Sequence, residues 1–246
     1  MHDQRTLICV PTYNEADNVV VLFEQLCALS LPDTDILFID DNSPDGTGRI
    51  LDQLAAKYPV LTIMHRQGKQ GIGSAHLAGI AYAYDHGYDV LITMDADFTH
   101  SPAYIHDFIR SAPGYDIVIS SRYMDKDSLQ GWNLLRRSLT FTGHQLTTRL
   151  LKMRFDVTGA FRLYQLKNIP RQAFTMVRSR SYSFFFESMF ILNFNRFRIV
   201  EIPIKLPPRT YGHSKMRMKD VMQSVKFLFV IYLNSVFNPK RFRIQS

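Results

Sequence analysis

Short apolar runs recur along the first half of the chain, and each is followed by a segment with helical spacing. Continuous apolar runs are typical of strands that are buried on both sides of a parallel sheet. Since strands that alternate with helices at this spacing build such a sheet, we expect an α/β fold with a mostly parallel sheet and helices on both faces. Strands are predicted over residues 6–10, 35–39, 60–64, 90–93 and 116–120, and helices over residues 18–29, through Leu54, and over about 71–85.

Polar and charged residues gather after the predicted strands. They are Tyr13, Glu15, Asp40, Asp41, Lys69, Asp95, Asp97 and Arg122. Ligands of open α/β sheets bind outside the carboxyl ends of the strands, so we expect these side chains to share one rim, with a nucleotide beside them. Gly71 and Gly73 open a helix, and helix N-termini favour anions. Their spacing is not the G-x-G-x-x-G of dinucleotide-binding proteins, which argues against an NAD enzyme.

The pair Asp95 and Asp97 directly follows the apolar run 90–93. Hard carboxylate oxygens at positions i and i+2 suit Mg²⁺ or Mn²⁺, ions that usually share their coordination shell with substrate phosphates. The pattern therefore indicates a metal-bridged diphosphate site. A solvated turn at the end of a strand is the alternative, because Asp is common in turns.

The formal charge of +7 conceals a division along the chain. Residues 1–100 carry 14 Asp and Glu against 5 Lys and Arg, a net charge of −9, whereas the remaining residues carry 8 against 24, a net charge of +16. An acidic half suits a metal ion, and a basic half suits phosphate or an anionic membrane surface. The basic half also raises the alternative of nucleic-acid binding, but no recognisable reading motif accompanies it, so no nucleic-acid partner is expected.

Two segments of the basic half, residues 132–153 and 218–236, place apolar residues at helical spacing beside Lys and Arg. Basic amphipathic helices bind in the interface of a bilayer, although apolar stripes also form cores and subunit interfaces. We therefore expect a catalytic domain of residues 1–215 and a membrane-peripheral helix and tail of residues 216–246.

Other features of the sequence bear on the compartment. No apolar run approaches the roughly 20 residues that span a bilayer, and no signal peptide opens the chain. Cys9 and Cys27 are predicted to be buried thiols, which favours a reducing compartment. The histidines lack the ligand spacing of a zinc site.

Eight short motifs run from residue 11 to about residue 216. They are residues 11–15, 39–47, 69–75, 95–97, 121–123, 131–132, 158–164 and 209–215. Together they resemble family 2 glycosyltransferases of the GT-A fold, a Rossmann-like nucleotide-diphospho-sugar transferase fold, and within that family the dolichyl- or polyprenyl-phosphate mannose synthases. The first four motifs are shared widely in the family, and the later ones are more specific to lipid-phosphate acceptors.

The resemblance implies roles for individual residues. The base and ribose would be held by Pro11, Tyr13, Glu15, Ile39 and Asp41, with Lys69 also in the nucleotide-sugar site, and the diphosphate and its metal by Asp95, Ala96, Asp97 and Thr99. The acceptor phosphate would be held by Arg122, Arg136 and Thr140, and the donor phosphates would be reached by Arg209 and Lys215. Of these, Asp97, Arg122, Arg136, Thr140, Arg209 and Lys215 form the expected catalytic set, and Asp95, Asp97 and Thr99 the expected metal ligands. Asn42, Thr99 and Thr140 depart from the family's usual residues.

The function that the resemblance implies is inverting transfer of a hexose, with mannose from GDP-mannose favoured, onto a polyprenyl or dolichyl phosphate. It implies Mg²⁺ or Mn²⁺ as cofactor and a location at the cytoplasmic face of a membrane, with a membrane-anchoring subunit as a candidate partner. Three alternatives stay open: another donor such as UDP-glucose, a sugar hydroxyl acceptor with Glu187 or Asp156 as general base, and a non-catalytic nucleotide-sugar-binding subunit.

Overall fold

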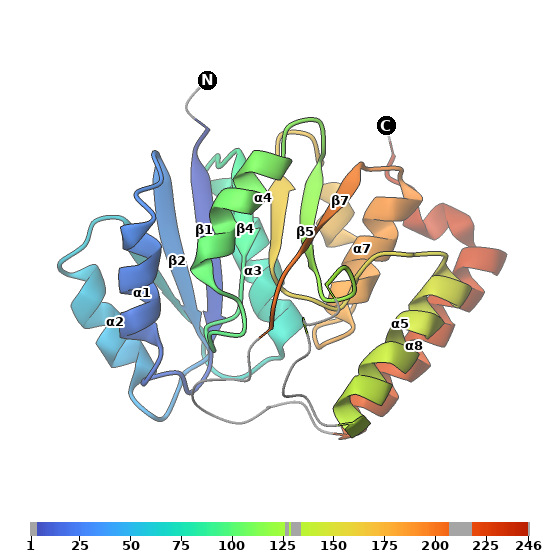
Figure 1. The fold of residues 1–246 in the computed structure, drawn as a ribbon, viewed down its shortest axis with the longest axis horizontal. Coiled ribbons are helices and arrows are strands. Elements are labelled where there is room, and N and C mark those ends of the chain that lie inside the picture. The colour runs from blue at the N-terminus through green and yellow to red at the C-terminus, as the bar shows by residue number, and fades with distance from the viewer. Residues whose placement is uncertain (1–3, 126–127, 129–133, 207–217, 246) are drawn as a thin grey trace.

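A seven-stranded sheet forms the middle of the molecule, with the strand order β3-β2-β1-β4-β6-β5-β7 (Figure 1). The computed structural model describes residues 4–125, 128, 134–206 and 218–245, without the side chains of 134–137. The strands are β1 (Thr6–Thr12), β2 (Thr34–Asp40), β3 (Leu61–His65), β4 (Val90–Thr93), β5 (Ile117–Ser121), β6 (Arg162–Gln165) and β7 (Ile199–Pro203). The five predicted strands are confirmed as β1 to β5.

Two strands that the sequence pattern did not predict complete the sheet. β6 lies between β4 and β5 and runs antiparallel to both, while β7 pairs in parallel with β5 at the edge. The remaining pairs, β1 with β2, β1 with β4 and β2 with β3, are parallel. The sheet is therefore mostly parallel, and the carboxyl ends of β1, β2, β4 and β5 meet at one edge, at the bottom of Figure 1.

Helices cover both faces of the sheet, because the parallel strands are apolar on both sides. Ile8 and Val10 pack toward α1, α2 and α4, whereas Leu7 and Cys9 pack toward α3, α6 and α7. The helices are α1 (Val19–Ala28), α2 (Thr47–Ala55), α3 (Ile72–Asp85), α4 (Ile105–Ser111), α5 (Leu134–Leu151), α6 (Gln172–Thr175), α7 (Phe184–Phe194) and α8 (Met218–Phe237), with 3₁₀ turns η1 (Pro102–Tyr104) and η2 (Pro239–Phe242). The predicted helices correspond to α1, α2, α3, α5 and α8.

The start of α3 packs tightly against the segment that leads into α7. A Cβ atom added at Gly73 would lie 2.5 Å from Phe184 Cβ and 2.6 Å from the carbonyl oxygen of Ser181. Gly71 adopts a φ of +94°, a backbone conformation that glycine reaches without a steric penalty. The two glycines are thus required by packing and backbone geometry, in addition to any anion that the helix N-terminus attracts.

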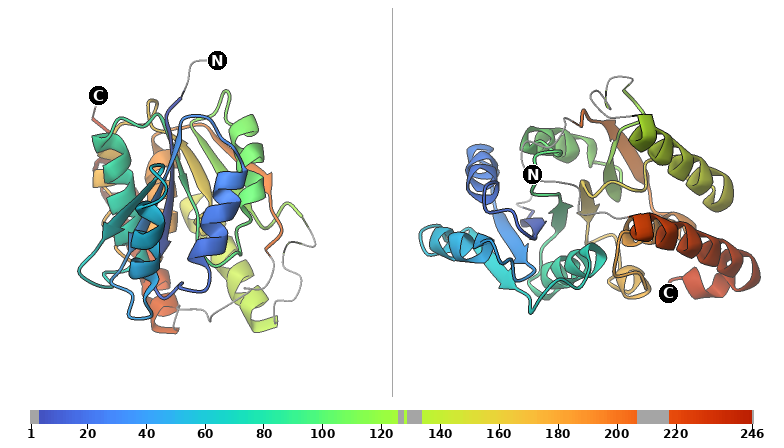
Figure 2. Two further views of the ribbon diagram at one scale, coloured as in Figure 1. Left: turned by 90° about the vertical axis from the view of Figure 1, so that its left-hand side faces the viewer. Right: turned by 90° about the horizontal axis from the view of Figure 1, so that it is seen from below.

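The long helices α5 and α8 contact each other at the end of the molecule farthest from β3 (Figures 1 and 2). Leu228 and Ile231 of α8 are buried, and other apolar side chains of this helix face outward: Met218, Met222, Phe229, Val230, Leu233, Val236 and Phe237. α8 is therefore apolar on both its inner and its outer side.

Three expectations about the C-terminal half and the thiols can be compared with this structure. No uninterrupted apolar run of bilayer-spanning length occurs, but with 20 residues and a mean hydropathy of 1.2, α8 is long and apolar enough to cross a bilayer by length and composition. Core helices of soluble proteins pass the same test. The predicted domain boundary at 215 and 216 lies outside the described residues and stays a prediction. Cys9 is buried as predicted, but Cys27 is exposed.

Candidate active site

A cavity of about 830 Å³ opens at the edge where the parallel strands end. Its wall contains ten of the predicted site residues: Pro11, Tyr13, Glu15, Asp41, Lys69, Asp95, Ala96, Asp97, Thr99 and Arg122. They come from the ends of β1, β2, β4 and β5 and from the segment before α3, as expected for an open α/β sheet. The two aspartates and Arg122, which lie far apart in the sequence, thus face one shared space.

The turn after β4 holds the two aspartates in place. Asp97 Oδ1 accepts hydrogen bonds from the backbone N–H of Thr99 at 3.1 Å and from its hydroxyl at 2.5 Å. The backbone N–H of Asp95 donates to His100 Nδ1 at 3.2 Å, and this nitrogen also lies 3.7 Å from the Asp95 carboxylate. Phe98 has a φ of +59°, which turns the chain sharply between Asp97 and Thr99. Thr99, the departure from the family pattern, therefore orients Asp97.

The donor set of this turn fits a hard divalent cation. Among the described residues, no group of three or more His, Cys, Asp and Glu side chains gathers to hold a metal ion. An ion at Asp95 and Asp97 would accordingly take two protein carboxylates and complete its shell from phosphate and water, as Mg²⁺ commonly does.

Another part of the cavity wall is organised around Asp41. Arg66 Nη1 lies 3.0 Å from Asp41 Oδ1, and both side chains are more than nine-tenths buried. Burial raises the pKa of Asp41, although Arg66 opposes the shift. Lys69 Nζ lies 4.6 Å above the ring of Tyr13, a cation–π contact. This part of the wall presents a carboxylate, an aromatic ring and an ammonium group to a ligand.

Ile39 of β2 and Asn42, which follows the strand, were both singled out by the resemblance. Ile39 is fully buried and does not line the cavity. Asn42, which stands where the family more often has glycine, adopts a φ of +57°. Asn tolerates this left-handed region better than most residues, so the substitution keeps the turn.

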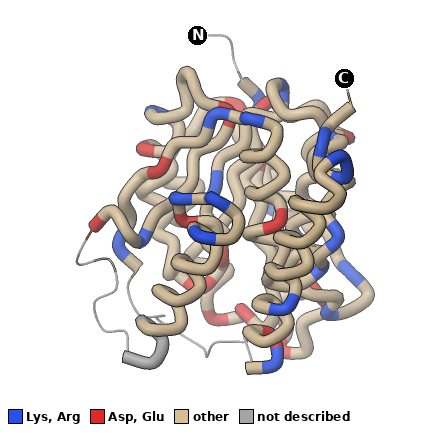
Figure 3. Tube along the Cα trace, turned by 90° about the vertical axis from the view of Figure 1, so that its right-hand side faces the viewer, with Lys and Arg blue, Asp and Glu red and all other residues tan. Residues whose placement is uncertain are grey.

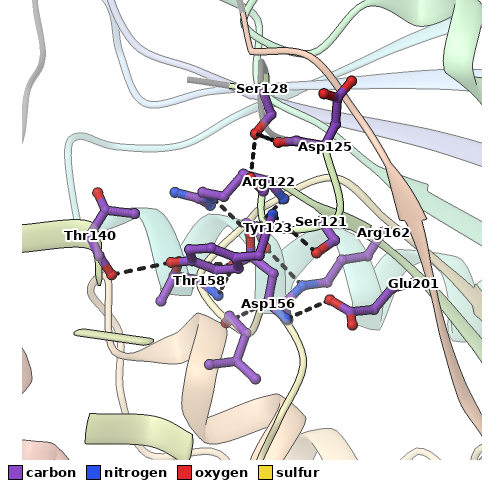
Figure 4. Close-up of polar contacts among 12 residues, drawn as sticks. Ser121, Arg122, Tyr123, Asp125, Ser128, Thr140, Asp156, Thr158, Arg162 and Glu201 are labelled. Atoms are coloured by element: carbon purple, nitrogen blue, oxygen red, sulfur yellow. Dashed lines mark hydrogen bonds and ion pairs between the residues drawn. The ribbon is translucent and has the colours of Figure 1, made fainter. Parts of the chain in front are cut away.

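Arg122 follows β5 and forms the cationic side of the cavity. Its Nε donates to Asp156 Oδ2 at 2.7 Å, and its backbone N–H donates to the same oxygen at 3.2 Å (Figure 4). Burial by itself would lower the pKa of Arg122, but the combined effect of Asp156, Tyr123 and Asp95 outweighs burial, and the pKa is raised. The guanidinium is therefore held as a cation in a largely buried position.

The residue after Arg122 connects the cavity to α5. The Tyr123 hydroxyl donates to the backbone carbonyl of Thr140 at 3.2 Å, and the Tyr123 ring stacks on His144 with centroids 4.0 Å apart. Thr140 does not line the cavity, and its carbonyl oxygen accepts the hydrogen bond from Tyr123. Arg136 lies in α5 with its side chain outside the described part, and Arg209 and Lys215 also lie outside the described residues.

The sequence pattern missed part of the cavity wall. Further lining residues are Thr12, Gly71, Ile72, Ala75, His100, Thr158, Gly159, Ala160, Ser181, Tyr182, Phe185, Leu206 and Asp220. Residues 158–160 belong to a motif that was recognised without a role for each residue. Asp220 comes from the first turn of α8, and no local signal in the sequence associates it with the strand ends.

The two carboxylates considered as general bases are placed elsewhere. Glu187 is fully buried in α7, and its Oε2 accepts the backbone N–H groups of Arg178 and Ser179 at 3.0 and 2.7 Å. Burial raises the pKa of Glu187. Asp156 is buried in its ion pair with Arg122. Neither residue lines the cavity, so the structure does not support either one as a base that contacts a substrate.

Comparisons with known proteins identify the family of the chain. The model of the family described as "Glycosyl transferase family 2" matches residues 7–185. The chain is 34% identical over 225 residues to a polyprenol monophosphomannose synthase of Mycolicibacterium smegmatis, covering 90% of this chain and 84% of that protein. It is 33% identical over 213 residues to an undecaprenyl-phosphate mannosyltransferase of Micrococcus luteus, covering 86% of this chain and 87% of the other.

Solved structures share the fold at lower identity. One is glucosyl-3-phosphoglycerate synthase of Mycobacterium tuberculosis in complex with Mn²⁺ and uridine-diphosphate-glucose, with a TM-score of 0.67, 14% identity, and coverage of 93% of this chain and 79% of that one. Another is mannosyl-3-phosphoglycerate synthase of Rubrobacter xylanophilus, with a TM-score of 0.63, 16% identity, and coverage of 98% and 76%. The predicted GT-A type of α/β fold is confirmed by these likenesses.

Proposed function

The chain belongs to glycosyltransferase family 2, and from this premise we propose that it transfers a mannosyl group from GDP-mannose to a polyprenyl phosphate. The observation that carries the proposal is the shared cavity, in which Asp95 and Asp97 face the same space as Arg122. The relatives named for mannosyl transfer to polyprenyl phosphates cover most of the chain, which supports the same acceptor class here.

The acidic side of the cavity is assigned to the donor. Tyr13, Asp41 and Lys69 would surround the base and ribose, while Asp95 and Asp97 would hold Mg²⁺ or Mn²⁺ against the diphosphate. A divalent ion held there would neutralise the negative charge that develops on the leaving diphosphate. Thr99 contributes by orienting Asp97 through its hydroxyl and its backbone N–H.

The basic side is assigned to the acceptor. A phosphate monoester has a second pKa of about 6 and is already a nucleophilic anion near neutral pH, so it needs no general base. An acceptor oxygen attacks the anomeric carbon as the bond to the diphosphate breaks, and the diphosphate leaves with the bonding electrons. Arg122 would bring the two anions together, because a guanidinium matches phosphate geometry. Attack opposite the leaving group inverts the anomeric centre.

A hydroxyl acceptor is the second candidate within the family, since it requires a carboxylate base. Glu187 and Asp156 were the residues considered for that role, and neither lines the cavity. Their positions remove the two carboxylates that were considered as the base, so a hydroxyl acceptor would need another one, such as Asp220, which does line the cavity.

The location that we propose is the cytoplasmic face of a membrane. The outward apolar side chains of α8 are followed by Lys240, Arg241 and Arg243, a combination that binds anionic bilayer surfaces, and Figure 3 shows basic residues beside the C-terminus. α8 contacts α5 and, through Asp220, reaches the cavity, so a bilayer bound there would deliver a lipid phosphate close to the donor. The proposal does not require a separate anchoring subunit.

A transfer assay tests the proposed function. The protein is incubated with Mg²⁺ or Mn²⁺, labelled GDP-mannose and a polyprenyl phosphate, and the lipid phase is extracted. We expect labelled mannosyl-phosphoryl-polyprenol of β configuration, and none without metal. Absence of labelled lipid with GDP-mannose, and with UDP-glucose and the other common donors, would overturn the proposal.

A further inference from the structure

The Asp156 carboxylate divides its two oxygens between two tasks. Oδ1 accepts the backbone N–H and the hydroxyl of Thr158, both at 3.2 Å, whereas Oδ2 accepts the Nε and the backbone N–H of Arg122. The residue is 2% exposed. Arg122 and Thr158 line the cavity but Asp156 does not, so this carboxylate acts on the site through its neighbours.

The segment that carries Asp156 is itself fixed from both sides. The backbone N–H of Asp156 donates to Glu201 Oε1 of β7 at 2.8 Å. The fully buried Arg162 donates from Nη2 to the carbonyl oxygen of Val157 and from Nε to that of Gly159, each at 2.8 Å. The strands β6 and β7 thus hold residues 156–159 in one conformation (Figure 4).

This anchoring sets the direction of the Arg122 guanidinium. With Nε and the backbone N–H both bound to Asp156 Oδ2, the side chain turns so that Nη2 lies 3.5 Å from the position of a Cβ atom at Gly159, on the cavity wall. An arginine has many rotamers, and a guanidinium that recognises phosphate is useful only in the correct orientation.

We propose that Asp156 is a positioning residue, which aims the guanidinium of Arg122 at the reacting phosphates. The inference rests on the proposed function, because it takes the ligand of Arg122 to be a phosphate in the cavity. It assigns no contact between Asp156 and a substrate. We therefore expect a substitution of Asp156 to lower kcat only in a protein that retains Arg122.

The variant Asp156→Asn tests this, since the amide has nearly the same shape but lacks the charge that holds Nε. We expect kcat to fall about 10²-fold, the effect typical of a misplaced reacting group, with a small change in the KM for the nucleotide sugar. In an Arg122→Ala background, the same substitution should lower kcat by less than about twofold, because residues that act through one another are not additive. Equal fold-losses in the two backgrounds would overturn the inference, as would an unchanged kcat.

Chemical rescue gives a second readout. Added guanidinium chloride at low millimolar concentration should restore part of the activity of Arg122→Ala, because Asp156 still offers a buried anionic place for the ion. It should not restore the double variant with Asp156→Asn. Equal rescue of both proteins would contradict a positioning role for Asp156.

A matched control separates positioning from stability. Asp116 is also buried and pairs with an arginine, Arg198 at 3.2 Å, but this pair lies away from the cavity wall. Asp116→Asn should lower the midpoint of thermal unfolding and leave kcat unchanged. If Asp156→Asn does not fold, Glu201→Ala replaces it, since it removes only the acceptor of the Asp156 N–H, and its loss of turnover should likewise disappear without Arg122. Loss that persists there would overturn the inference.

Different results would overturn the proposed function and the role of Asp156. If the unchanged protein transfers no sugar to a lipid phosphate, the proposed function is wrong. If it does so but the substitutions at 156 and 122 act independently, only the role of Asp156 is wrong.

Discussion

The two sides of the cavity are built by different means. In the turn after β4, on the acidic side, the contacts that orient the two aspartates are local: Asp97 is held by a residue two positions away, and Asp95 by one five positions away. On the basic side they are distant, since Asp156 lies 34 positions from Arg122 and Glu201 lies 45 positions from Asp156. A single turn thus organises Asp95 and Asp97, whereas three separate segments are needed to hold one guanidinium.

The difference has a physical origin. Carboxylates at the end of a strand can be oriented by the N–H groups and hydroxyls of the turn that follows. A long arginine side chain has no such local partner, and a buried guanidinium requires a counter-charge that only tertiary structure provides. We therefore expect substitutions on the acidic side to act individually and those on the basic side to act as a network.

The largest expected effect is that of Asp97→Asn on the acidic side. Removing one of the two carboxylates that would hold the metal should lower kcat about 10³-fold, the cost of losing a main electrostatic contact to a developing charge. Turnover is measured in the transfer assay at saturating Mn²⁺, with thermal unfolding as the check on folding. When the metal is chelated, the kcat of the unchanged protein and that of Asp97→Asn should become nearly equal. A variant with normal turnover would exclude Asp97 from the donor site.

The next effect concerns the outer side of α8. Replacing Phe229 and Leu233 by Asp should weaken binding to anionic vesicles about 10- to 100-fold, because each side chain is about half exposed and would add about half of the 1.5 to 3 kcal/mol that full burial of a large apolar side chain contributes. Flotation with vesicles of phosphatidylglycerol and phosphatidylcholine measures it. The control pair is Val21 and Val60, which are also exposed but lie in the acidic half, and their replacement by Asp should leave flotation unchanged. Equal losses in both pairs would remove α8 as the membrane contact.

The buried His76 gives a pH-dependent prediction. It lies in α3, stacks on Phe184 with centroids 5.4 Å apart, and burial lowers its pKa to about 3. As pH falls below about 6.5, the unfolded chain binds a proton that the native state does not, so stability falls with pH down to about 3.

The expected loss from this group between pH 7.5 and 5 is about 2 kcal/mol, at about 1.4 kcal/mol per pKa unit. His76→Phe should remove this part of the pH dependence, and urea unfolding at the two pH values measures it. The exposed His106 provides the comparison, as a histidine replaced by Phe at the surface. The prediction fails if His76→Phe keeps the full acid sensitivity.

The smallest effect is expected at Tyr123, on the basic side. Tyr123→Phe keeps the ring on His144 but removes the hydrogen bond to the Thr140 carbonyl, a contribution of about 1 kcal/mol. We expect the KM for the polyprenyl phosphate to rise about fivefold and the KM for GDP-mannose to stay constant, since α5 lies on the acceptor side. Steady-state kinetics with each substrate varied in turn measures both constants. A change in the KM for GDP-mannose alone would contradict the prediction, because it would associate Tyr123 with the donor rather than with the acceptor.

The same contrast explains how much of the molecule could be predicted from the sequence. Strands β1 to β5 could be predicted because they are apolar runs, and the polar residues after them predict the rim of the cavity. β6 was missed because it is short and carries the buried Arg162 and Gln165. α7 was missed because nine of its eleven residues are buried, so it shows no amphipathic period.

For the site, local patterns identified the acidic side, including Asp95, Asp97 and Asp41. They identified Arg122 through a motif, but its pairing with Asp156 and the arrival of Asp220 depend on strand order and helix packing. A single sequence does not contain that information in any local pattern. The roles of Arg136, Arg209 and Lys215 stay predictions.

We propose that one cavity holds both anions, with the metal and the diphosphate at Asp95 and Asp97 and the acceptor phosphate at Arg122. The most direct measurement is a crystal structure with Mn²⁺, GDP and a short polyprenyl phosphate, in which anomalous scattering locates the metal. We predict the Mn²⁺ between Asp95 and Asp97, and the acceptor phosphate within hydrogen-bond distance of the Arg122 guanidinium. An acceptor phosphate bound outside this cavity, with Arg122 turned away from it, would contradict the claim.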